Sequence, residues 1–578
     1  MTPSRDHLRE HIASIVDRGP YSLADTILRL GGVDGPDLLA LSASGGREDF
    51  GQLMAACESA MAAGTRMPGT YRLRTLGALA SMLVGRQLRE PRHTTAARLF
   101  RYIHEQHGSQ GQSKVFGRLM VQTNLAAGEF DFVRRVIAEP AGASEAFDDE
   151  IRWMARAELL GPGVLGDDFD AAAWLDVFNE PIIAAGASPV ILRDGDGAPF
   201  DRLAAGVQQS DAVEHVATDG PLISVVMSVH APDHSLSTAV HSILAQSWTN
   251  LELLVIDDCS PAEFAPVLDK VAGLDPRIRL LRMAENGGTY RIRNRALREA
   301  RGDLITFQDS DDWSHPERLA RQAAPLAEQP GLVATLSASA RVSADLSLNA
   351  VGYSPTRTNM SSLMFRREPV ADRLGGFDTV RKGADSEFFE RLVLTYGEPS
   401  VLRMPDVMAA VQLTTESLSR GDFSFRWQAP SRVVYREAFQ RWHAHIVAGT
   451  SSPFLDDIGP RRFPAPYRFL HKGDVPAETT DVLLVSDWRD IAGADGHAAA
   501  SVRALVGAGL DVSIAHTETL RAATRSRSQT LVEALEMRED GTASWVIWDE
   551  PRHARVTVVD DPELMMLRTA RGSRLTTD

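Results

Sequence analysis

The sequence predicts a mixed α/β protein with three parts. Its central unit is a mostly parallel sheet, preceded by an all-helical unit and followed by a small α/β unit. From residue 220 onward, apolar β-branched runs of strand length alternate with helical patterns, which is typical of such a sheet. The first 215 residues have few such runs. The 578 residues are enough for about three or four domains, each with its own core.

Residues 1–215 are predicted to form helices separated by short Gly/Pro breaks. The clearest segment, 113–137, contains an apolar helix, a turn at Gly128-Glu129-Phe130-Asp131 and a second helix. It is similar to one hairpin of a tetratricopeptide-like array, although no strict repeat period is present. Trp153 and Trp174 lie at helical spacing and are expected in the core. The unit either docks a protein partner or only packs, and the sequence favours neither interpretation.

The central unit is expected over residues 220–445. Its predicted strands are 223–229, 251–256, 278–283, 303–307, 332–342 and 361–365. A helix from about Ala384 to Tyr396 follows, with Phe388 and Leu392 on one face. Strands that alternate with helices join by right-handed crossovers. Ligands of such sheets bind outside the carboxyl ends of the strands.

The end of the chain is predicted to hold a linker and a second α/β unit. Residues 446–480 are Pro-rich and resemble a linker with little regular structure. The unit 481–578 opens with a strand at 481–487, and a helix over 496–508 and strands at 511–515 and 545–548 follow. Roughly 100 residues is half of a two-lobed nucleotide-binding domain. We therefore interpret this unit as accessory.

Three carboxylates follow the strand 303–307 within four positions: Asp309, Asp311 and Asp312. Carboxylates that close repel one another and stay ionised only with a cation among them. Oxygen ligands suit Mg²⁺ or Mn²⁺. The alternative is an acidic turn that caps the next helix at Ser314-His315-Pro316-Glu317. Taken alone, the acidic stretch supports both interpretations about equally.

A series of motifs extends this pattern over about a third of the chain. The motifs are Val225-Val226-Met227-Ser228-Val229-His230, Ser242-Ile243-Leu244-Ala245-Gln246-Ser247-Trp248, Leu254-Val255-Ile256-Asp257-Asp258-Cys259-Ser260, Asn286-Gly287-Gly288 with Arg293-Asn294, Asp309-Ser310-Asp311-Asp312, and Gly375-Gly376-Phe377-Asp378 followed by Asp385. In this order they resemble the catalytic domain of a family-2 glycosyltransferase with the GT-A fold. The unit 481–578 is similar to the opening lobe of a GT-B glycosyltransferase.

The resemblance implies a metal-dependent enzyme that transfers a sugar from a nucleotide-sugar, most simply a UDP-sugar, to an acceptor hydroxyl with inversion. It implies Mn²⁺ or Mg²⁺ at Asp309 and Asp311. The implied donor-binding residues are Ser228, Asp257, Asp258, Arg291, Arg293 and Asp309. For each arginine, a solvated basic helix face is an equal alternative. Asp385 matches the base that deprotonates the acceptor, with Glu387 as the fallback.

Two departures from the family pattern bear on these roles. The first strand ends in Ser228-Val229-His230-Ala231 where a Pro-x-Tyr-Asn-like sequence is usual, and Ala384 replaces an acidic residue. The expected pathway is assembly of a surface or capsular polysaccharide. One alternative is a non-catalytic scaffold that binds partners through its helical unit. Another, a sugar nucleotidyltransferase, is disfavoured because no Gly-rich loop with a basic residue follows the first strand.

Composition excludes several other classes. The formal net charge of -16 argues against nucleic acid as a main partner. The two cysteines, Cys57 and Cys259, lack metal or redox spacing, which fits a reducing compartment. No signal peptide and no membrane span are evident. The expected location is the cytoplasm, with a peripheral position at the inner face of the plasma membrane as the alternative.

Overall fold

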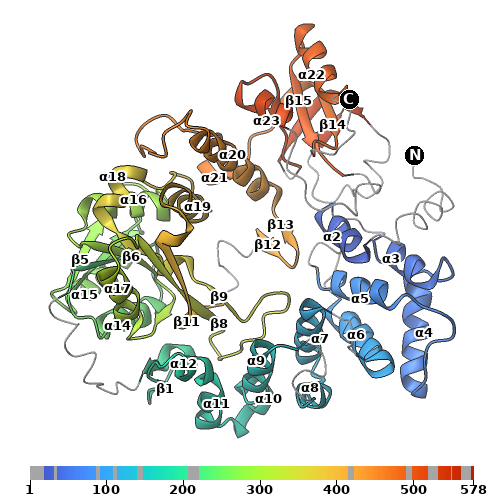
Figure 1. Cartoon of the computed structure of the whole chain (residues 1–578), viewed down its shortest axis with the longest axis horizontal. Coiled ribbons are helices and arrows are strands. Elements are labelled where there is room, and N and C mark those ends of the chain that lie inside the picture. Colours follow the sequence, from blue (N-terminus) through green and yellow to red (C-terminus); the bar gives the residue numbers. More distant parts are fainter. Residues whose placement is uncertain are drawn as a thin grey trace.

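Helices form the first part of the chain, a large sheet forms the middle and a small sheet forms the end (Figure 1). The computed structural model describes residues 19–30, 35–85, 92–108, 113–139, 147–205, 220–413, 422–489, 497–518, 532–548, 550–560 and 575–577. The expected boundary at residues 215–220 lies outside these ranges except for residue 220. The expected helix start at residue 496 also lies outside them. No helix in the described ranges is long and apolar enough to cross a bilayer.

The helical unit packs around one apolar core. Its elements are α2 (Pro20–Leu30), α3 (Gly35–Ser44), α4 (Phe50–Ala63), α5 (Leu73–Met82), α6 (His93–His107), α7 (Lys114–Ala126), α8 (Phe130–Ile137), α9 (Asp149–Leu159), α10 (Pro162–Leu165), α11 (Ala171–Phe178) and α12 (Glu180–Ala184). The predicted hairpin is α7 and α8, and the Ser113 hydroxyl caps α7 by accepting from the Phe116 amide. Trp153 and Trp174 are buried, as expected, and Trp174 stacks on Phe178.

A mostly parallel sheet forms the centre of the molecule. Its strands lie in the order β5 (Ile278–Arg282), β4 (Leu251–Asp257), β3 (Ile223–Val229), β6 (Leu304–Asp309), β10 (Met364–Arg366), β8 (Ala334–Val342), β11 (Val401–Gln412) and β7 (Trp313–Ser314), with β9 (Thr356–Thr358) paired to β8. The first four are parallel. The strand expected over 361–365 is a 3-10 turn, Met360–Ser362, followed by β10.

Helices cover both faces of this sheet because side chains of a strand point alternately to either face. In β3, Val225 and Met227 pack on one face and Val226 on the other. The first face is covered by α14 (Ser235–Leu244), α15 (Ala265–Ala272) and α17 (Arg318–Glu328). The second is covered by α16 (Thr289–Glu299), α18 (Arg367–Leu374), α19 (Ala384–Tyr396) and α20 (Pro430–Val447). The two clusters make this a doubly wound α/β unit, built on the mostly parallel sheet that the sequence predicts.

The segment 446–480 differs from the predicted linker. Three of its apolar side chains, Leu455, Phe463 and Phe469, are buried in the core on the α16–α20 face. Leu455 also pairs with Gly375 through the backbone, and α21 (Tyr467–Leu470) gives part of the segment regular structure. Its prolines prevent periodic structure but not burial. This segment is therefore packed onto the central unit rather than extended between two units.

The end of the chain is an all-parallel sheet with the order β16 (Ser544–Trp545), β15 (Val512–His516), β14 (Glu478–Ser486), β17 (Arg552–Val559) and β18 (Leu575–Thr577). The helices α22 (His497–Gly507) and α23 (Val532–Glu539) accompany it. The predicted strands at 481–487 and 511–515 are β14 and β15. Glu518, just after β15, accepts hydrogen bonds from Arg29 of α2, so this unit contacts the helical unit.

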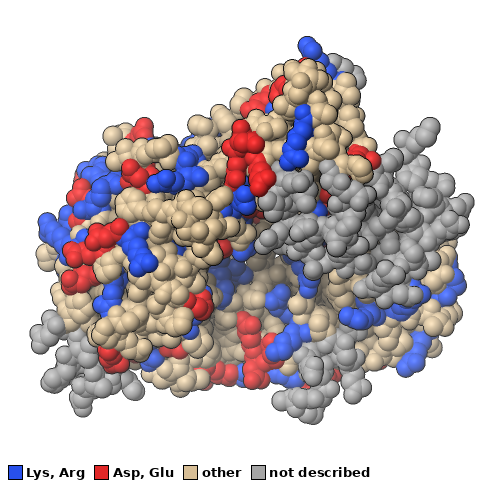
Figure 2. Space-filling view, turned by 45° about the horizontal axis from the view of Figure 1, so that its top comes forward, with Lys and Arg blue, Asp and Glu red and all other residues tan. Residues whose placement is uncertain are grey.

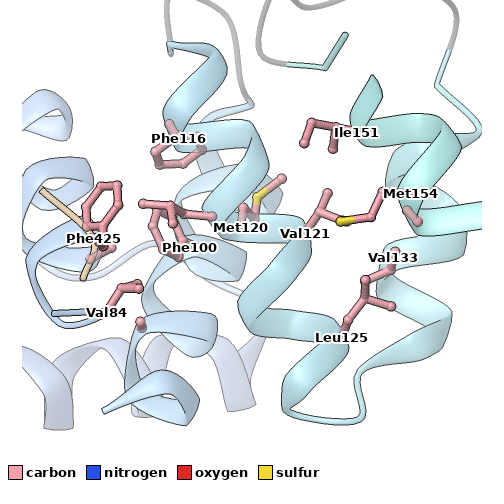
Figure 3. Packing of buried hydrophobic residues seen from close by; sticks show 14 of the residues in the cluster. Val84, Phe100, Phe116, Met120, Val121, Leu125, Val133, Ile151, Met154 and Phe425 are labelled. Carbon is pink, nitrogen blue, oxygen red and sulfur yellow. The ribbon is translucent and has the colours of Figure 1, made fainter. Parts of the chain in front are cut away.

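A short hairpin, β12 (Phe423–Ser424) and β13 (Trp427–Gln428), joins the central unit to the helical unit. Figure 3 shows Phe425, at its tip, beside Phe100 and Phe116 in the helical core. Its neighbour Arg426 pairs with Asp25 at 2.6 Å.

The face seen in Figure 2 is hollowed near its middle, and Lys, Arg, Asp and Glu side chains surround the hollow.

We expect Phe425→Ala to destabilise the protein by about 3 kcal/mol, because it removes a buried ring and leaves a cavity between two units. Phe425 is 6% exposed. Denaturant unfolding followed by intrinsic fluorescence measures this change. Phe454→Ala, at a ring that is 39% exposed, is the matched control and should cost far less. Equal midpoints for the two variants would show that the hairpin does not anchor the helical unit.

Candidate functional site

Three predicted site residues meet where β3, β4 and β6 end. The register pairs Ser228 with Asp309 across β3 and β6, and Val229 with Asp257 across β3 and β4. The next two strands in the chain, β4 and β5, lie on one side of β3, and β6 lies on its other side, so this is the point where the strand order reverses. Ligands of doubly wound sheets bind at such points. The structure thus brings Ser228, Asp257 and Asp309 together.

The acidic cluster lies at the end of β6. Asp309 accepts a hydrogen bond from the Ser361 hydroxyl at 2.7 Å, and Asp312 accepts one from the backbone amide of Gln412 at 2.9 Å. Burial, followed by the charge of Asp309, raises the pKa of Asp311 to about 6. None of the three carboxylates caps the next helix, because α17 begins after Glu317 and has no side-chain cap. The alternative interpretation of the cluster as a capping turn is therefore wrong.

Asp309 and Asp311 fit a divalent cation. Burial and then the charge of Asp309 raise the pKa of Asp311, and a cation between the two carboxylates would offset both effects. Within the described ranges, no group of three or more His, Cys, Asp or Glu side chains could hold a metal. Two carboxylates leave positions open for water and substrate phosphates, as Mg²⁺ and Mn²⁺ sites usually do. Asp312 is buried and holds the end of β11 through Gln412.

Asp257 and Asp258 both hold loops beside the site. Asp257 accepts from the Ser260 amide and hydroxyl. Asp258 accepts from the amides of Gly287 and Gly288, each at 2.8 Å. Gly288 has φ 84°, a left-handed conformation that suits glycine. These bonds fix the loop between β5 and α16 against the ends of β3 and β4.

The two predicted diphosphate-binding arginines lie in different environments. Arg291 is exposed and pairs with Glu285 at 2.9 Å, which fits the solvated basic face. Arg293 is buried, and its guanidinium carbon lies 4.2 Å from the ring centre of Phe307 and near the rings of Tyr290 and Phe377. Arg293 therefore packs the core behind the acidic cluster. A role for either arginine at a diphosphate stays a prediction.

Asp385 is in the first turn of α19 and is partly exposed. The buried Tyr290 hydroxyl lies against it, and burial, followed by the charge of Asp385, raises the pKa of Tyr290 well above its usual range. Tyr290 therefore stays protonated and donates to the carboxylate. The hydroxyl also accepts from the Gly383 amide at 3.1 Å, which fixes the start of α19. Tyr290 connects Asp385 to Arg293, and Arg293 packs on Phe307, two residues before Asp309.

The prediction that Glu387 could serve as the fallback base is wrong. It is fully buried and accepts from Arg391 at 2.7 Å and from His443 at 3.0 Å. Burial alone would raise its pKa, but the charge of Arg391 and the His443 bond hold the pKa of Glu387 below its ordinary value. A carboxylate enclosed by two such partners cannot reach an acceptor hydroxyl. Its partner His443 lies on α20, 56 residues away in sequence.

We expect Glu387→Gln to destabilise the protein by about 3–5 kcal/mol, because it leaves the Arg391 charge buried without a partner. Since the folded pKa of Glu387 is depressed, the ion pair stabilises at pH values above the unfolded pKa, and this contribution is lost as the pH falls through the folded pKa. Urea unfolding at neutral and acidic pH measures both effects. Glu390→Gln, at a partly exposed carboxylate of the same helix, should cost less than about 1 kcal/mol. A similar loss in both variants would contradict this account.

Four residues near the site are absent from the sequence prediction. Ser361 bonds Asp309, and the charge of Asp233 contributes to the raised pKa of Asp311. Tyr290 orients Asp385, and Arg381 bonds the Asn286 side chain at 2.6 Å in the loop that Asp258 holds. Each comes from a segment remote in sequence from its partner, so no local motif could have indicated it.

Comparison with known proteins identifies the family. Residues 224–386, which contain every predicted site residue except the fallback Glu387, match the model of glycosyl transferase family 2. The putative colanic acid biosynthesis glycosyl transferase WcaA of Escherichia coli is 32% identical over 200 residues, which cover 31% of this chain and 69% of that protein. The chain belongs to glycosyl transferase family 2. The putative teichuronic acid biosynthesis glycosyltransferase TuaG of Bacillus subtilis is 34% identical over 102 residues, 18% of this chain and 40% of TuaG.

Other relatives cover smaller parts of this family-2 chain. An uncharacterized glycosyltransferase of Haemophilus influenzae is 37% identical over 102 residues. The chain spans about 40% of the length of this relative and of TuaG. Among solved structures, S. aureus TarS 1-349 in complex with UDP-GlcNAc is 19% identical, with a TM-score of 0.31 over 38% of this chain and 65% of that chain. The mannosyltransferase PcManGT of Pyrobaculum calidifontis, in complex with GDP-Man and Mn²⁺, is also 19% identical, with a TM-score of 0.29 over 41% of this chain and 67% of that chain.

Proposed function

We propose that this protein transfers a sugar from a nucleoside diphosphate sugar to an acceptor hydroxyl, with inversion at the anomeric carbon. The observation that carries the proposal is the meeting of Ser228, Asp257 and Asp309 at the point where the strand order reverses. The family-2 membership gives the reaction class. The relatives named for teichuronic and colanic acid biosynthesis support a role in surface polysaccharide assembly.

The donor lies over the ends of β3, β4 and β6. In this arrangement the Asp257 side of the site meets the nucleobase, and the Asp309 side meets the diphosphate. A divalent cation held by Asp309 and Asp311 would neutralise the charge that grows on the diphosphate as the glycosidic bond breaks. The Asp258 bonds to Gly287 and Gly288 keep the wall of the donor site rigid, so little reorganisation is needed on binding.

Asp385 takes the proton from the acceptor hydroxyl. The acceptor oxygen then forms a bond to the anomeric carbon as the bond to the diphosphate oxygen breaks, and the diphosphate leaves with the electron pair. Attack opposite the leaving group inverts the configuration. Tyr290 holds the carboxylate by a hydrogen bond from a hydroxyl that stays protonated. Such a positioned base contributes roughly 10²–10⁴-fold to the rate.

A panel of nucleotide-sugars tests the function. Release of nucleoside diphosphate is measured for each donor, with and without Mn²⁺. We expect release from at least one donor, and we expect it to stop when EDTA removes the cation. Failure of every donor, with or without an added glycan acceptor, would contradict the proposal and favour a non-catalytic scaffold.

A further inference from the structure

Three arginines converge beside the acidic cluster, on the side away from the donor strands. Arg118 of α7 donates to the Ser354 hydroxyl at 2.6 Å, and Arg341 of β8 donates to the Ser354 carbonyl at 3.2 Å. Arg357 lies on β9, which pairs with β8. The three come from two units of the protein, because α7 belongs to the helical unit and β8 and β9 to the central sheet.

These guanidinium groups repel one another. The pKa of Arg341 falls to about 10, first because of burial and then because of the charges of Arg357 and Arg118. Burial is also the main cause of the lowered pKa of Arg118, and its Nε atom is buried with no hydrogen-bond partner. Among the described residues, none of the three arginines forms an ion pair with a carboxylate. Arg118 and Arg341 are half-buried without a carboxylate partner, which is costly unless an anion joins them.

The neighbouring carboxylates are engaged elsewhere. Glu150 attracts Arg118, but its Oε1 atom accepts from the amide and hydroxyl of Thr356. Asp148 also attracts Arg118, and its side chain caps α9 at the Ile151 amide. Asp25 pairs with Arg426, the other cation that acts on Arg118. Because hydrogen bonds from neutral donors leave these charges in place, at most two carboxylates, Glu150 and Asp148, balance the three arginines, and the cluster keeps an excess of positive charge.

The cluster adjoins the proposed reaction centre. Arg341 pairs with Val411 across β8 and β11, and the next residue of β11, Gln412, donates to Asp312. The charge of Arg357 acts on Asp312 as well. The arginines thus lie on the β8–β11 side of β6, which carries the acidic cluster, and the other two donor strands, β3 and β4, lie on the opposite side of β6. A molecule bound at the arginines would approach the sugar from the acceptor side.

We propose that Arg118, Arg341 and Arg357 bind an anionic group, a phosphate or a carboxylate, of the acceptor glycan. The inference rests on the proposed function, because it assigns a substrate class to the same site. A guanidinium forms two parallel, charge-assisted bonds with either group, which gives both affinity and orientation. Arg118 makes the helical unit part of the acceptor site. Its bond to Ser354 and the Gln122 bonds to Ala350 and Tyr353 hold the two units together there.

Binding of model oligomers to the full chain tests the proposal. The probes are a glycerol phosphate oligomer, an oligogalacturonate and a neutral malto-oligosaccharide of equal length, measured by calorimetry with Mn²⁺ and excess nucleoside diphosphate present. We expect at least one anionic oligomer to bind, more weakly at high salt, and the neutral one not to bind. The oligomer that binds distinguishes phosphate from carboxylate. Binding of the neutral oligomer with equal affinity, or of none of the three, would overturn the proposal.

Variants locate the bound anion. Arg357→Gln and Arg341→Gln should each weaken binding by roughly tenfold or more, because each removes a charge-assisted bond. Arg357 is exposed, so its variant should fold even if the Arg341 variant does not. Arg403→Gln, at the opposite end of β11 and paired with Glu398, is the matched control and should bind as the wild type does. Wild-type affinity in Arg357→Gln would overturn the proposal. Donor hydrolysis by the wild-type protein tests the proposed function separately, and its absence would leave the binding result standing.

Discussion

Asp385→Asn should lower the rate of sugar transfer roughly 10²–10⁴-fold and leave donor affinity unchanged. The amide has nearly the shape of the carboxylate but cannot take the acceptor proton. The Tyr290 hydroxyl can still donate to the amide oxygen, so the start of α19 should keep its position. Steady-state transfer assays give the rate, and calorimetry with the nucleoside diphosphate gives the affinity.

The control for Asp385→Asn is Glu390→Gln, the same chemical change on the same helix. Glu390 pairs with Arg436 on α20 and is not part of the site. Its variant should transfer at the wild-type rate. If Asp385→Asn also keeps that rate, another group deprotonates the acceptor. If it loses donor binding together with transfer, Asp385 belongs to the donor site instead.

Asp311→Asn should abolish metal-dependent donor binding. We expect the affinity for Mn²⁺ to fall by more than about tenfold, since even loss of an outer-shell partner typically costs ten- to a hundredfold. The raised pKa of Asp311 means that its buried charge opposes folding at neutral pH, so the neutral amide should not reduce the free energy of unfolding. Mn²⁺ titration by electron paramagnetic resonance measures the affinity.

Asp269→Asn is the matched control for the metal prediction. Asp269 is exposed on α15 and pairs with Arg282. Its variant should bind Mn²⁺ as the wild type does. Unchanged Mn²⁺ affinity in Asp311→Asn would place the cation elsewhere. A loss of affinity accompanied by a lower unfolding free energy would instead indicate that the substitution disrupts the fold.

The sequence predicts the donor side of the site well because parallel strands bring their carboxyl ends to one edge. Ser228, Asp257 and Asp309 each lie within two residues of the end of a predicted strand, and the register places them together. Motif position favours Asp385 and leaves Glu387 as the fallback, without a physical reason to exclude Glu387. Their difference lies in Arg391 and His443, which bury Glu387 in an ion pair.

The remaining features depend on packing between distant segments. The predicted linker is buried through Leu455, Phe463 and Phe469, and Pro-rich composition carries no sign of that. The arginine cluster joins α7 to the β8–β9 connection, more than 200 residues away. Phe425 joins the helical core from a hairpin that has no sequence pattern of its own. No local period or spacing encodes such contacts.

A crystal structure with Mn²⁺ and a nucleoside diphosphate tests the central claim most directly. Anomalous scattering locates the cation without ambiguity. We predict a Mn²⁺ peak within ligand distance of Asp309 and Asp311, with the diphosphate bound to it and the Asp385 carboxylate facing the open side. A peak remote from these carboxylates, or a diphosphate bound away from the ends of β3, β4 and β6, would contradict the account.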